Sequence, residues 1–252
     1  MTTHLLVPGA IVCVPKSQFA DYNERIHRDY DRILKQPGHR DRLPQIITHP
    51  DTVRGLTPKL NWCFDHIHDD EALVFVDDDI TSVQRCFTER GEESTIRDPD
   101  TIGQIIRTTF IQARDLGAFY FGWEASNGAL RYYTGLKPIM LTGYINGCAM
   151  GFRAGHGLRF DDRIVAKNDF DIAAMNAWCH RLCFKNCRYT FCQKETFVGK
   201  GGQVAFRNSD TERRDVALLR KKWGDIFQTG GYSGTRKRDY AGIAKITMRL
   251  PF

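Results

Sequence analysis

The feature that most constrains this fold is a short apolar run that ends in three adjacent carboxylates. Residues 73–76 are Leu, Val, Phe and Val, a composition that indicates a buried strand. Asp77, Asp78 and Asp79 follow, where the strand must leave the sheet. Asp77 and Asp79 are two residues apart, so an extended backbone points both the same way and lets them share one divalent cation. A cation bound by only two protein oxygens keeps its other positions free for phosphates.

The same three residues have a second interpretation. An acid-rich stretch after a strand is also typical of a solvated turn in which an Asp caps the next helix. The buried strand before the acids favours a site, because ligands of open α/β sheets bind outside the carboxyl ends of the strands. The sequence therefore favours a cation site and leaves the solvated turn open.

Length and composition favour one α/β domain over residues 1–252. The 252 residues are 42% hydrophobic and 12% aromatic, which is enough for a sizeable core. Predicted strands and helices alternate along the chain, as in an α/β sheet. We expect strands at 10–14, 45–48, 73–76, 118–123, 138–152, 188–192 and 243–250. We expect helices from residue 19, from Thr57 as N-cap, from Asp100, from Asp169 to Cys183, and from Asp210 as N-cap to about Trp223.

The sequence predicts a protein of the cytoplasm. No apolar run reaches the length of a membrane span. Residues 1–13 lack a basic flank and contain Pro8 and Gly9, so they predict a first strand rather than a signal peptide. We therefore expect no membrane partner.

The eight cysteines raise the question of a zinc site. Three of them recur every four residues, with another cysteine and a histidine close by: Cys179, Cys183, Cys187, Cys192 and His180. Structural zinc is usually completed by a second, distant pair, and the sequence lacks one. Cys179 and Cys183 share a predicted helix face with Met175, so we interpret them as core residues.

A second group of carboxylates begins the predicted helix at residue 169. Asp169 and Asp171 can serve as helix caps, because a helix N-terminus stabilises negative charge. The alternative is that Asp169 is a general base, which takes a proton from a hydroxyl nucleophile. Asp171, two residues on, is expected to face the other way.

Glycine-rich stretches lie on either side of this helix. Residues 143–152 can let backbone approach a ligand closely, which makes Tyr144, Asn146, Gly147 and Cys148 candidate binding residues. Residues 199–202 read Gly-Lys-Gly-Gly and can wrap a diphosphate, with Lys200 as its charge partner.

Positive charge is concentrated late in the chain. The net charge is +6, and the pI of about 8.9 indicates an anionic partner. A predicted helix and the Gly-rich loop after it carry the cations Arg213, Arg214, Arg220, Lys221, Lys222, Arg236, Lys237 and Arg238. Such a pattern is typical either of a solvated helix face or of a surface for a nucleic-acid backbone.

The order of these parts resembles the GT-A fold glycosyltransferases, over about residues 11–223. Residues 54–56, before a helix, and the Val-Asp-Asp-Asp run at 76–79 are similar to the nucleotide-binding half of that family. Residues 168–171 are similar to its (Glu/Asp)-Asp catalytic motif, with Asn168 in place of the usual acid. The resemblance implies a Rossmann-like mixed sheet flanked by helices, with a nucleotide-sugar half at about 1–125 and an acceptor half at about 126–252.

The compact size, the Asp-Asp-Asp run and the Gly-Lys-Gly-Gly segment resemble, more narrowly, the TET-associated glycosyltransferases. These largely phage-encoded enzymes add sugars to hydroxymethylated pyrimidines of DNA. The resemblance implies transfer of a hexose or pentose from a UDP-sugar to a base such as 5-hydroxymethylcytosine, in the cytoplasm of a bacteriophage host.

The resemblance also implies roles for individual residues. Asp77 and Asp79, its DxD motif, would ligate Mn²⁺ or Mg²⁺, and Asp169 would be the base. The donor-binding set would be Pro15, Arg54, Asp77, Asp78, Lys200 and Gly201. The family often uses a late histidine as a third metal ligand; no histidine follows His180, so water or another group must serve.

Other functions remain open at this stage. The acceptor of a GT-A enzyme can be a protein, a glycan or a lipid-linked sugar. The chain can also be a nucleic-acid-binding module without catalysis, or a nuclease, since clustered carboxylates build two-metal sites as well.

Overall fold

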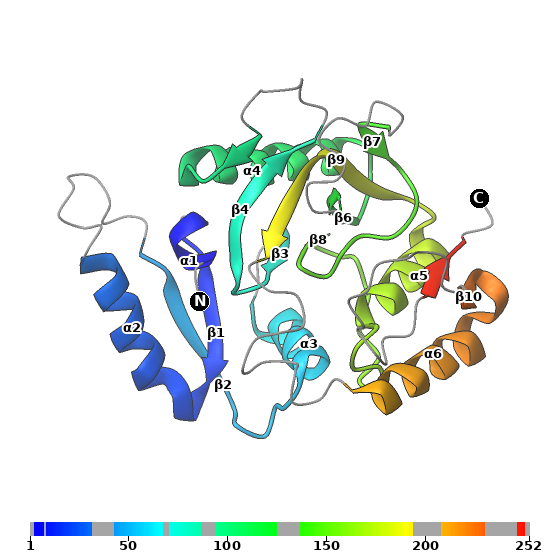
Figure 1. Cartoon of the computed structure of the whole chain (residues 1–252), viewed down its shortest axis with the longest axis horizontal. Coiled ribbons are helices and arrows are strands. Elements are labelled where there is room, and N and C mark those ends of the chain that lie inside the picture. Colours follow the sequence, from blue (N-terminus) through cyan, green and yellow to red (C-terminus); the bar gives the residue numbers. More distant parts are fainter. Residues whose placement is uncertain are drawn as a thin grey trace, which may run out of the picture.

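The computed structural model describes residues 3–7, 9–31, 43–67, 71–86, 94–124, 137–193, 208–229 and 246–249. It is a mixed α/β structure with a curled mixed sheet flanked by helices (Figure 1). This confirms the predicted α/β class. No helix in the described part of the chain is long and apolar enough to cross a membrane.

The described residues form a main sheet of seven strands in the order β3–β8–β6–β9–β4–β5, with β7 paired to β9. Only β6 and β9 are parallel in this sheet, and the other pairs are antiparallel. The strands are β3 (Ala72–Val76), β4 (Ile80–Arg85), β5 (Thr95–Ile96), β6 (Tyr120–Glu124), β7 (Ile139–Met140), β8 (Ala149–Arg153) and β9 (Cys183–Gln193).

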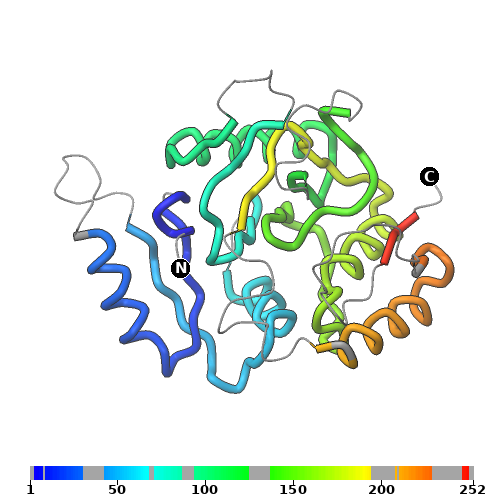
Figure 2. Tube along the Cα trace, viewed as in Figure 1, coloured from blue at the N-terminus to red at the C-terminus, as the bar shows by residue number. Residues whose placement is uncertain are grey.

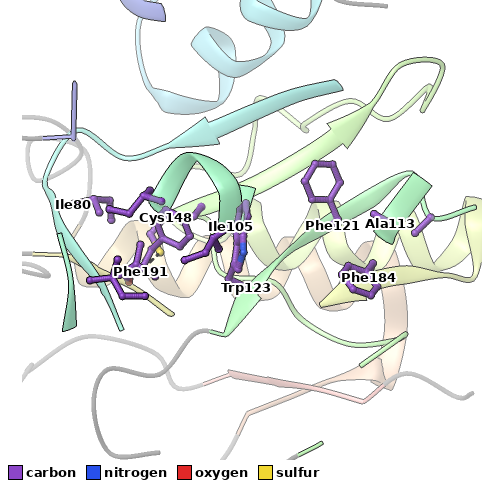
Figure 3. Packing of buried hydrophobic residues seen from close by; sticks show 13 residues of the cluster. Ile80, Ile105, Ala113, Phe121, Trp123, Cys148, Phe184 and Phe191 are labelled. Carbon is purple, nitrogen blue, oxygen red and sulfur yellow. Dashed lines mark hydrogen bonds between the residues drawn. The ribbon is translucent and has the colours of Figure 1, made fainter. Parts of the chain in front are cut away.

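Helices cover both faces of this sheet. On β6, Phe121 and Trp123 point toward α4 (Pro99–Asp115), while Tyr120 points toward the face covered by α3 (Leu56–His66) and α5 (Asn168–His180). This alternation is the two-residue period of a strand buried on both faces. Figure 3 shows the core on the α4 side, with Cys148, Ile80 and Phe191 at one end.

The N-terminal part forms a separate parallel pair rather than joining the main sheet. β1 (Ile11–Pro15) pairs with β2 (Gln45–His49), and α2 (Phe19–Asp31) packs beside them; η1 (Lys16–Gln18) links β1 to α2. The short helix α1 (Thr3–Leu6) lies within residues 1–13, where we expected a first strand, and its Leu6 packs against the core between the sheet and α4.

The last elements pack outside α5. Helix α6 (Ser209–Trp223) lies on the opposite side of the molecule from α2 (Figure 2). It is followed by η4 (Gly224–Ile226) and β10 (Phe227–Thr229), which pairs with β11 (Ile246–Met248). Leu219 and Phe227 form a third core with Ala174 of α5.

The strand before the carboxylates differs from the prediction. β3 is half-buried along its whole length rather than buried, because it is an edge strand with a single neighbour, β8. The predicted strand at 138–152 is instead the two short strands β7 and β8 with a loop between them.

Helix ends also differ from the prediction. The N-cap of α3 is Gly55 rather than Thr57, whose buried hydroxyl donates to the carbonyl of Ile164 at 2.9 Å. The N-cap of α6 is Asn208 rather than Asp210, since the Asn208 side chain accepts the first free backbone N–H groups.

The cysteine assignment is half right. Cys179 is exposed, in the last turn of α5, so it is not the core residue we expected. Cys183 is buried, but in β9, because the helix stops at His180 and Arg181 turns the chain with a positive φ.

Two glycines provide a test of this packing. Gly151 of β8 pairs with Phe121 of the neighbouring strand β6, and a Cβ at residue 151 would lie 2.2 Å from the Phe121 ring. We predict that Gly151→Ala destabilises the fold by about 1–3 kcal/mol through overpacking. The control is Gly103→Ala in α4, where a Cβ meets nothing within 4 Å. It should stabilise by about 0.5–1 kcal/mol. Urea unfolding of both variants measures this; equal stability of the two would contradict the packing.

Candidate functional site

The three carboxylates form a tight connection between β3 and β4, which we call the acidic turn (residues 77–79). The Asp77 N–H donates to the carbonyl of Cys148 at 2.9 Å. The Thr3 hydroxyl donates to the carbonyl of Asp77 and accepts from the N–H of Ile80 at 3.1 Å. Helix α1 and the start of β8 therefore fix the backbone of the turn from two sides.

A glutamine side chain joins the two outer carboxylates. Gln193 Nε2 donates to Asp77 Oδ2 at 2.9 Å and to Asp79 Oδ1 at 3.1 Å. Gln193 reaches them because it ends β9 and pairs in register with Ile80, the residue after the turn. Asp77 and Asp79 thus point to one place, as the two-residue spacing predicts.

Asp78 points elsewhere. It is exposed, and it lies near Tyr22 of α2, whose pKa is raised by burial and by the Asp78 carboxylate. The acidic turn therefore faces the β1–α2–β2 unit through Asp78 and the end of β9 through Asp77 and Asp79.

The carboxylates at the acidic turn repel one another. Burial, and then the carboxylates of Asp79, Asp78 and Asp169, raise the pKa of Asp77 from 3.8 to about 7. A cation between Asp77 and Asp79 would remove the largest part of this repulsion. The chemistry of the donor set therefore fits a hard divalent ion.

Asp169 begins α5 and is close enough to act on Asp77. Its Oδ2 accepts the Tyr144 hydroxyl at 2.5 Å, and its Oδ1 accepts the N–H of Phe170 at 2.9 Å. Burial raises the pKa of Asp169, while the Tyr144 hydrogen bond and the charge on Lys167 act in the opposite direction. The fold thus brings the two acidic segments of the sequence together.

The loop between β7 and β8 lies between these segments. Tyr144 stacks on Phe170, with ring centroids 4.4 Å apart. A Cβ at Gly147 would lie 3.3 Å from Asp169 Cβ, so this glycine allows the close approach. Asn146 Oδ1 accepts the N–H of Cys148 at 3.2 Å, and Cys148 is buried. The loop therefore contacts both acidic segments: Tyr144 and Gly147 contact Asp169, and Cys148 contacts the backbone of Asp77.

Helix α6 fixes the chain that leads into Asp169. Asp215 is fully buried, and its Oδ2 accepts the N–H groups of Val165 and Ala166 at 2.9 and 2.6 Å. Lys167 and Glu212, both buried, form an ion pair at 2.7 Å. These contacts determine where the N-terminus of α5 lies.

A carboxylate of α5, that of Asp171, makes a further buried contact with α6. Asp171 is fully buried and accepts from Lys222 Nζ and Trp223 Nε1 at 2.9 and 2.7 Å. This confirms that Asp171 faces away from Asp169. It also shows that Lys222, which we expected at a DNA backbone, has an internal partner, with a second one in Asp161 at 3.3 Å.

The remaining predicted residues lie on other elements or outside the described residues. Pro15 ends β1, and Arg54 is exposed after β2, with its Nε donating to the carbonyl of Asp51 at 3.5 Å. Arg220 and Lys221 are exposed on α6. The predicted residues outside the described part are Lys200, Gly201, Arg236, Lys237 and Arg238.

A cation at the turn would have few ligands from the protein. Within the described ranges, no group of three or more His, Cys, Asp and Glu side chains is arranged to bind a metal ion, which also applies to the cysteines considered for zinc. Asp77 and Asp79 supply two oxygens. The amide of Gln193, turned over, would present Oε1 as a third, because its oxygen and nitrogen occupy equivalent positions.

The sequence matches no model of a known protein family, and no curated protein matches it significantly.

Sequence reasoning missed three parts of the site. Gln193 and Thr3 act through contacts with residues more than 70 positions away, and neither lies in a recognisable motif. The third part is the pair of carboxylates on α6, which were missed because the charge pattern of this segment pointed only to its cations. The apolar-facing positions of Glu212 and Asp215, on the side of Leu219, were the available signal.

The repulsion at the turn predicts a pH-dependent stability. The folded protein keeps the Asp77 proton up to about pH 7, while the unfolded chain loses it near 3.8. The folded state therefore binds more protons in this window, and stability falls as the pH rises through it. We predict that Asp77→Asn raises the melting temperature at pH 8 and has little effect at pH 4. Thermal unfolding at both values measures this. A variant that melts below wild type at pH 8 would contradict the repulsion.

Proposed function

We propose that this protein is a metal-dependent glycosyltransferase that moves a sugar from a UDP-sugar to a hydroxymethylated pyrimidine of DNA. One observation carries the proposal: Asp77 and Asp79 converge on Gln193, and Asp169, from a distant segment, lies within electrostatic range of them. This gives two neighbouring carboxylates that can bind a cation and a separate carboxylate that can act as a base.

The donor side is supported by the acidic turn. Asp77 and Asp79, with Gln193, would ligate Mn²⁺ or Mg²⁺. When bound, the ion supplies positive charge that stabilises the leaving diphosphate. The protein has few ligands of its own here, which leaves coordination positions for the phosphate oxygens. Asp78 and Tyr22 would line the side toward the β1–α2–β2 unit, in which Pro15 ends β1 and Arg54 follows β2.

The acceptor side is supported by Asp169. Burial raises its pKa, which makes it a better base than an ordinary aspartate. It would take the proton from the acceptor hydroxyl as the hydroxyl attacks the sugar. A single base on this side fits an inverting transfer.

The exposed face of α6 supports the proposal that the acceptor is DNA. Arg220 and Lys221 are exposed there, on the helix whose inner face fixes the approach to Asp169. A phosphate backbone bound to this face would therefore lie on the helix that holds the start of α5. The target nucleotide would have to leave the duplex stack to reach the site.

The direct experiment is mass spectrometry of nucleosides after hydroxymethylated DNA is incubated with a panel of UDP-sugars and Mn²⁺. The proposal predicts a mass gain of one sugar on the modified pyrimidine. Donor hydrolysis without any gain on DNA would move the acceptor to a protein, glycan or lipid-linked sugar. Neither hydrolysis nor transfer with any donor would leave a nucleic-acid-binding module and exclude the proposal.

The metal role predicts the effect of one isosteric change. Asp79→Asn keeps the side-chain shape but removes a charged ligand, so transfer should fall by roughly 100-fold or more. The melting temperature should not fall, because Asp79 lies in a turn at the surface of the core. EDTA should abolish transfer by wild type, and Mn²⁺ should restore it. Full activity of the variant, or of wild type in EDTA, would exclude the metal role.

The cations of α6 divide into two groups with different expected effects. Replacing Arg220 and Lys221 together by Gln should weaken DNA binding and reduce the salt slope by about 2, without loss of stability. Lys222→Met should destabilise the fold by about 3 kcal/mol, since it leaves Asp171 buried without its cation. Fluorescence anisotropy across salt and urea unfolding separate the two. An unchanged salt slope in the double variant would make this face a solvated surface only.

A further inference from the structure

We propose that Tyr144 is the positioning residue of Asp169: its hydroxyl holds the Asp169 carboxylate toward the acceptor, and its ring does not stack on the acceptor. This inference rests on the proposed function, in which Asp169 is the base. It assigns to Tyr144 a role different from the acceptor contact that the sequence suggested.

The geometry points to a carboxylate with little rotational freedom. The Tyr144 hydroxyl donates to Oδ2 at 2.5 Å, and the Phe170 N–H donates to Oδ1 at 2.9 Å. The N–H of Gly147 is a third donor, and the missing Cβ of Gly147 allows Asp169 to lie against the loop. Each oxygen thus has a fixed partner and a remaining lone pair, which is the arrangement of an oriented base.

The phenol remains a donor at every working pH. Burial and the neighbouring Asp169 raise the pKa of Tyr144 well above its ordinary value, so the hydroxyl keeps its proton. Asp169 accepts that hydrogen bond most strongly in its charged form, and the bond therefore favours the form that can act as a base.

The ring of Tyr144 is already occupied. One of its faces lies against Phe170, with centroids 4.4 Å apart and planes 21° apart. Phe170 belongs to the same helix start as Asp169, so the stack fixes the hydroxyl relative to the carboxylate it supports. A ring that is partly buried in this way is poorly placed to receive a nucleobase.

Other ionisable groups also act on this position. Lys167, paired with Glu212 on α6, lowers the pKa of Asp169. Asp77 and Asp169 repel each other across the site. Burial raises the pKa values of Tyr120 of β6 and Cys148 before β8, and the charge of Asp169 adds to both shifts. These groups act on Asp169 through their charge or burial, whereas the Tyr144 hydroxyl donates a hydrogen bond directly to the Asp169 carboxylate.

The test compares two substitutions at one position. Tyr144→Phe keeps the ring and its stack but removes the hydroxyl, whereas Tyr144→Leu removes both. We expect kcat to fall about 10-fold or more in both variants, with KM for the donor unchanged. Tyr189→Phe, a half-buried tyrosine of β9 outside the site, is the matched control and should keep wild-type kinetics. A Phe variant with wild-type kcat and an inactive Leu variant would overturn the proposal in favour of stacking.

The pH dependence separates positioning from a purely structural role. Without the hydroxyl, the pKa of Asp169 rises, so the acidic limb of kcat should move to higher pH in Tyr144→Phe. Replacing Tyr144 by 3-fluorotyrosine, a stronger donor that keeps the packing, should move the limb the other way. An unmoved limb in a folded Phe variant and in the fluorotyrosine protein would overturn the proposal.

One readout is independent of the transfer reaction. Carbon-13 NMR of labelled aspartate follows the titration of Asp169 in wild type, Tyr144→Phe and the fluorotyrosine protein, whether or not any of them transfers a sugar. If wild type is inactive but the Asp169 titration shifts as expected, the proposed function fails while the hydrogen bond and its effect on Asp169 stand. If the three proteins titrate alike, the positioning role is wrong.

Discussion

The mutual repulsion of the carboxylates at the acidic turn is the constraint on which the site depends. Three adjacent aspartates end β3, and a fourth, Asp169, adds to the repulsion on Asp77. The turn keeps its shape because α1, β8 and β9 each supply a hydrogen bond to it. Like charges gathered by so many contacts from distant segments store free energy that an opposite charge releases. This is the physical basis for assigning a cation and its phosphate ligands to the turn.

The two halves of the site are held by different means. Asp77 and Asp79 lie in the turn between β3 and β4, and the register of β9 with β4 positions Gln193 against them. Asp169, the proposed base, lies at a helix start, which α6 holds through buried contacts of Asp215, Glu212 and Asp171. Helix α6 also carries cations that are exposed to solvent. A polyanion bound to them would lie on the helix that positions Asp169, the proposed base.

Local patterns predicted the strand before the acidic turn, the direction of Asp77 and Asp79, and most helices, because each depends on neighbouring residues. They did not predict β4, which follows the turn, so the alternative in which an aspartate of the turn caps a following helix is wrong. They did not predict Gln193, since its role follows from the pairing of β9 with β4, 114 residues from Asp79. Charge pattern alone also did not reveal the internal partner of Lys222, because a solvated cation and one paired with a buried acid look alike in sequence. Cys179 was misplaced for a related reason: the end of α5 at His180 depends on a positive φ at Arg181.

The proposed function requires the acidic turn to bind a divalent cation together with a nucleoside diphosphate. Electron paramagnetic resonance measures this directly, because free Mn²⁺ gives a strong signal that protein binding suppresses. We expect wild-type protein to remove the free Mn²⁺ signal more strongly when UDP is present than when it is absent, and we expect Asp79→Asn not to do so. Equal loss of signal in wild type and variant, or no effect of UDP on wild type, would contradict it.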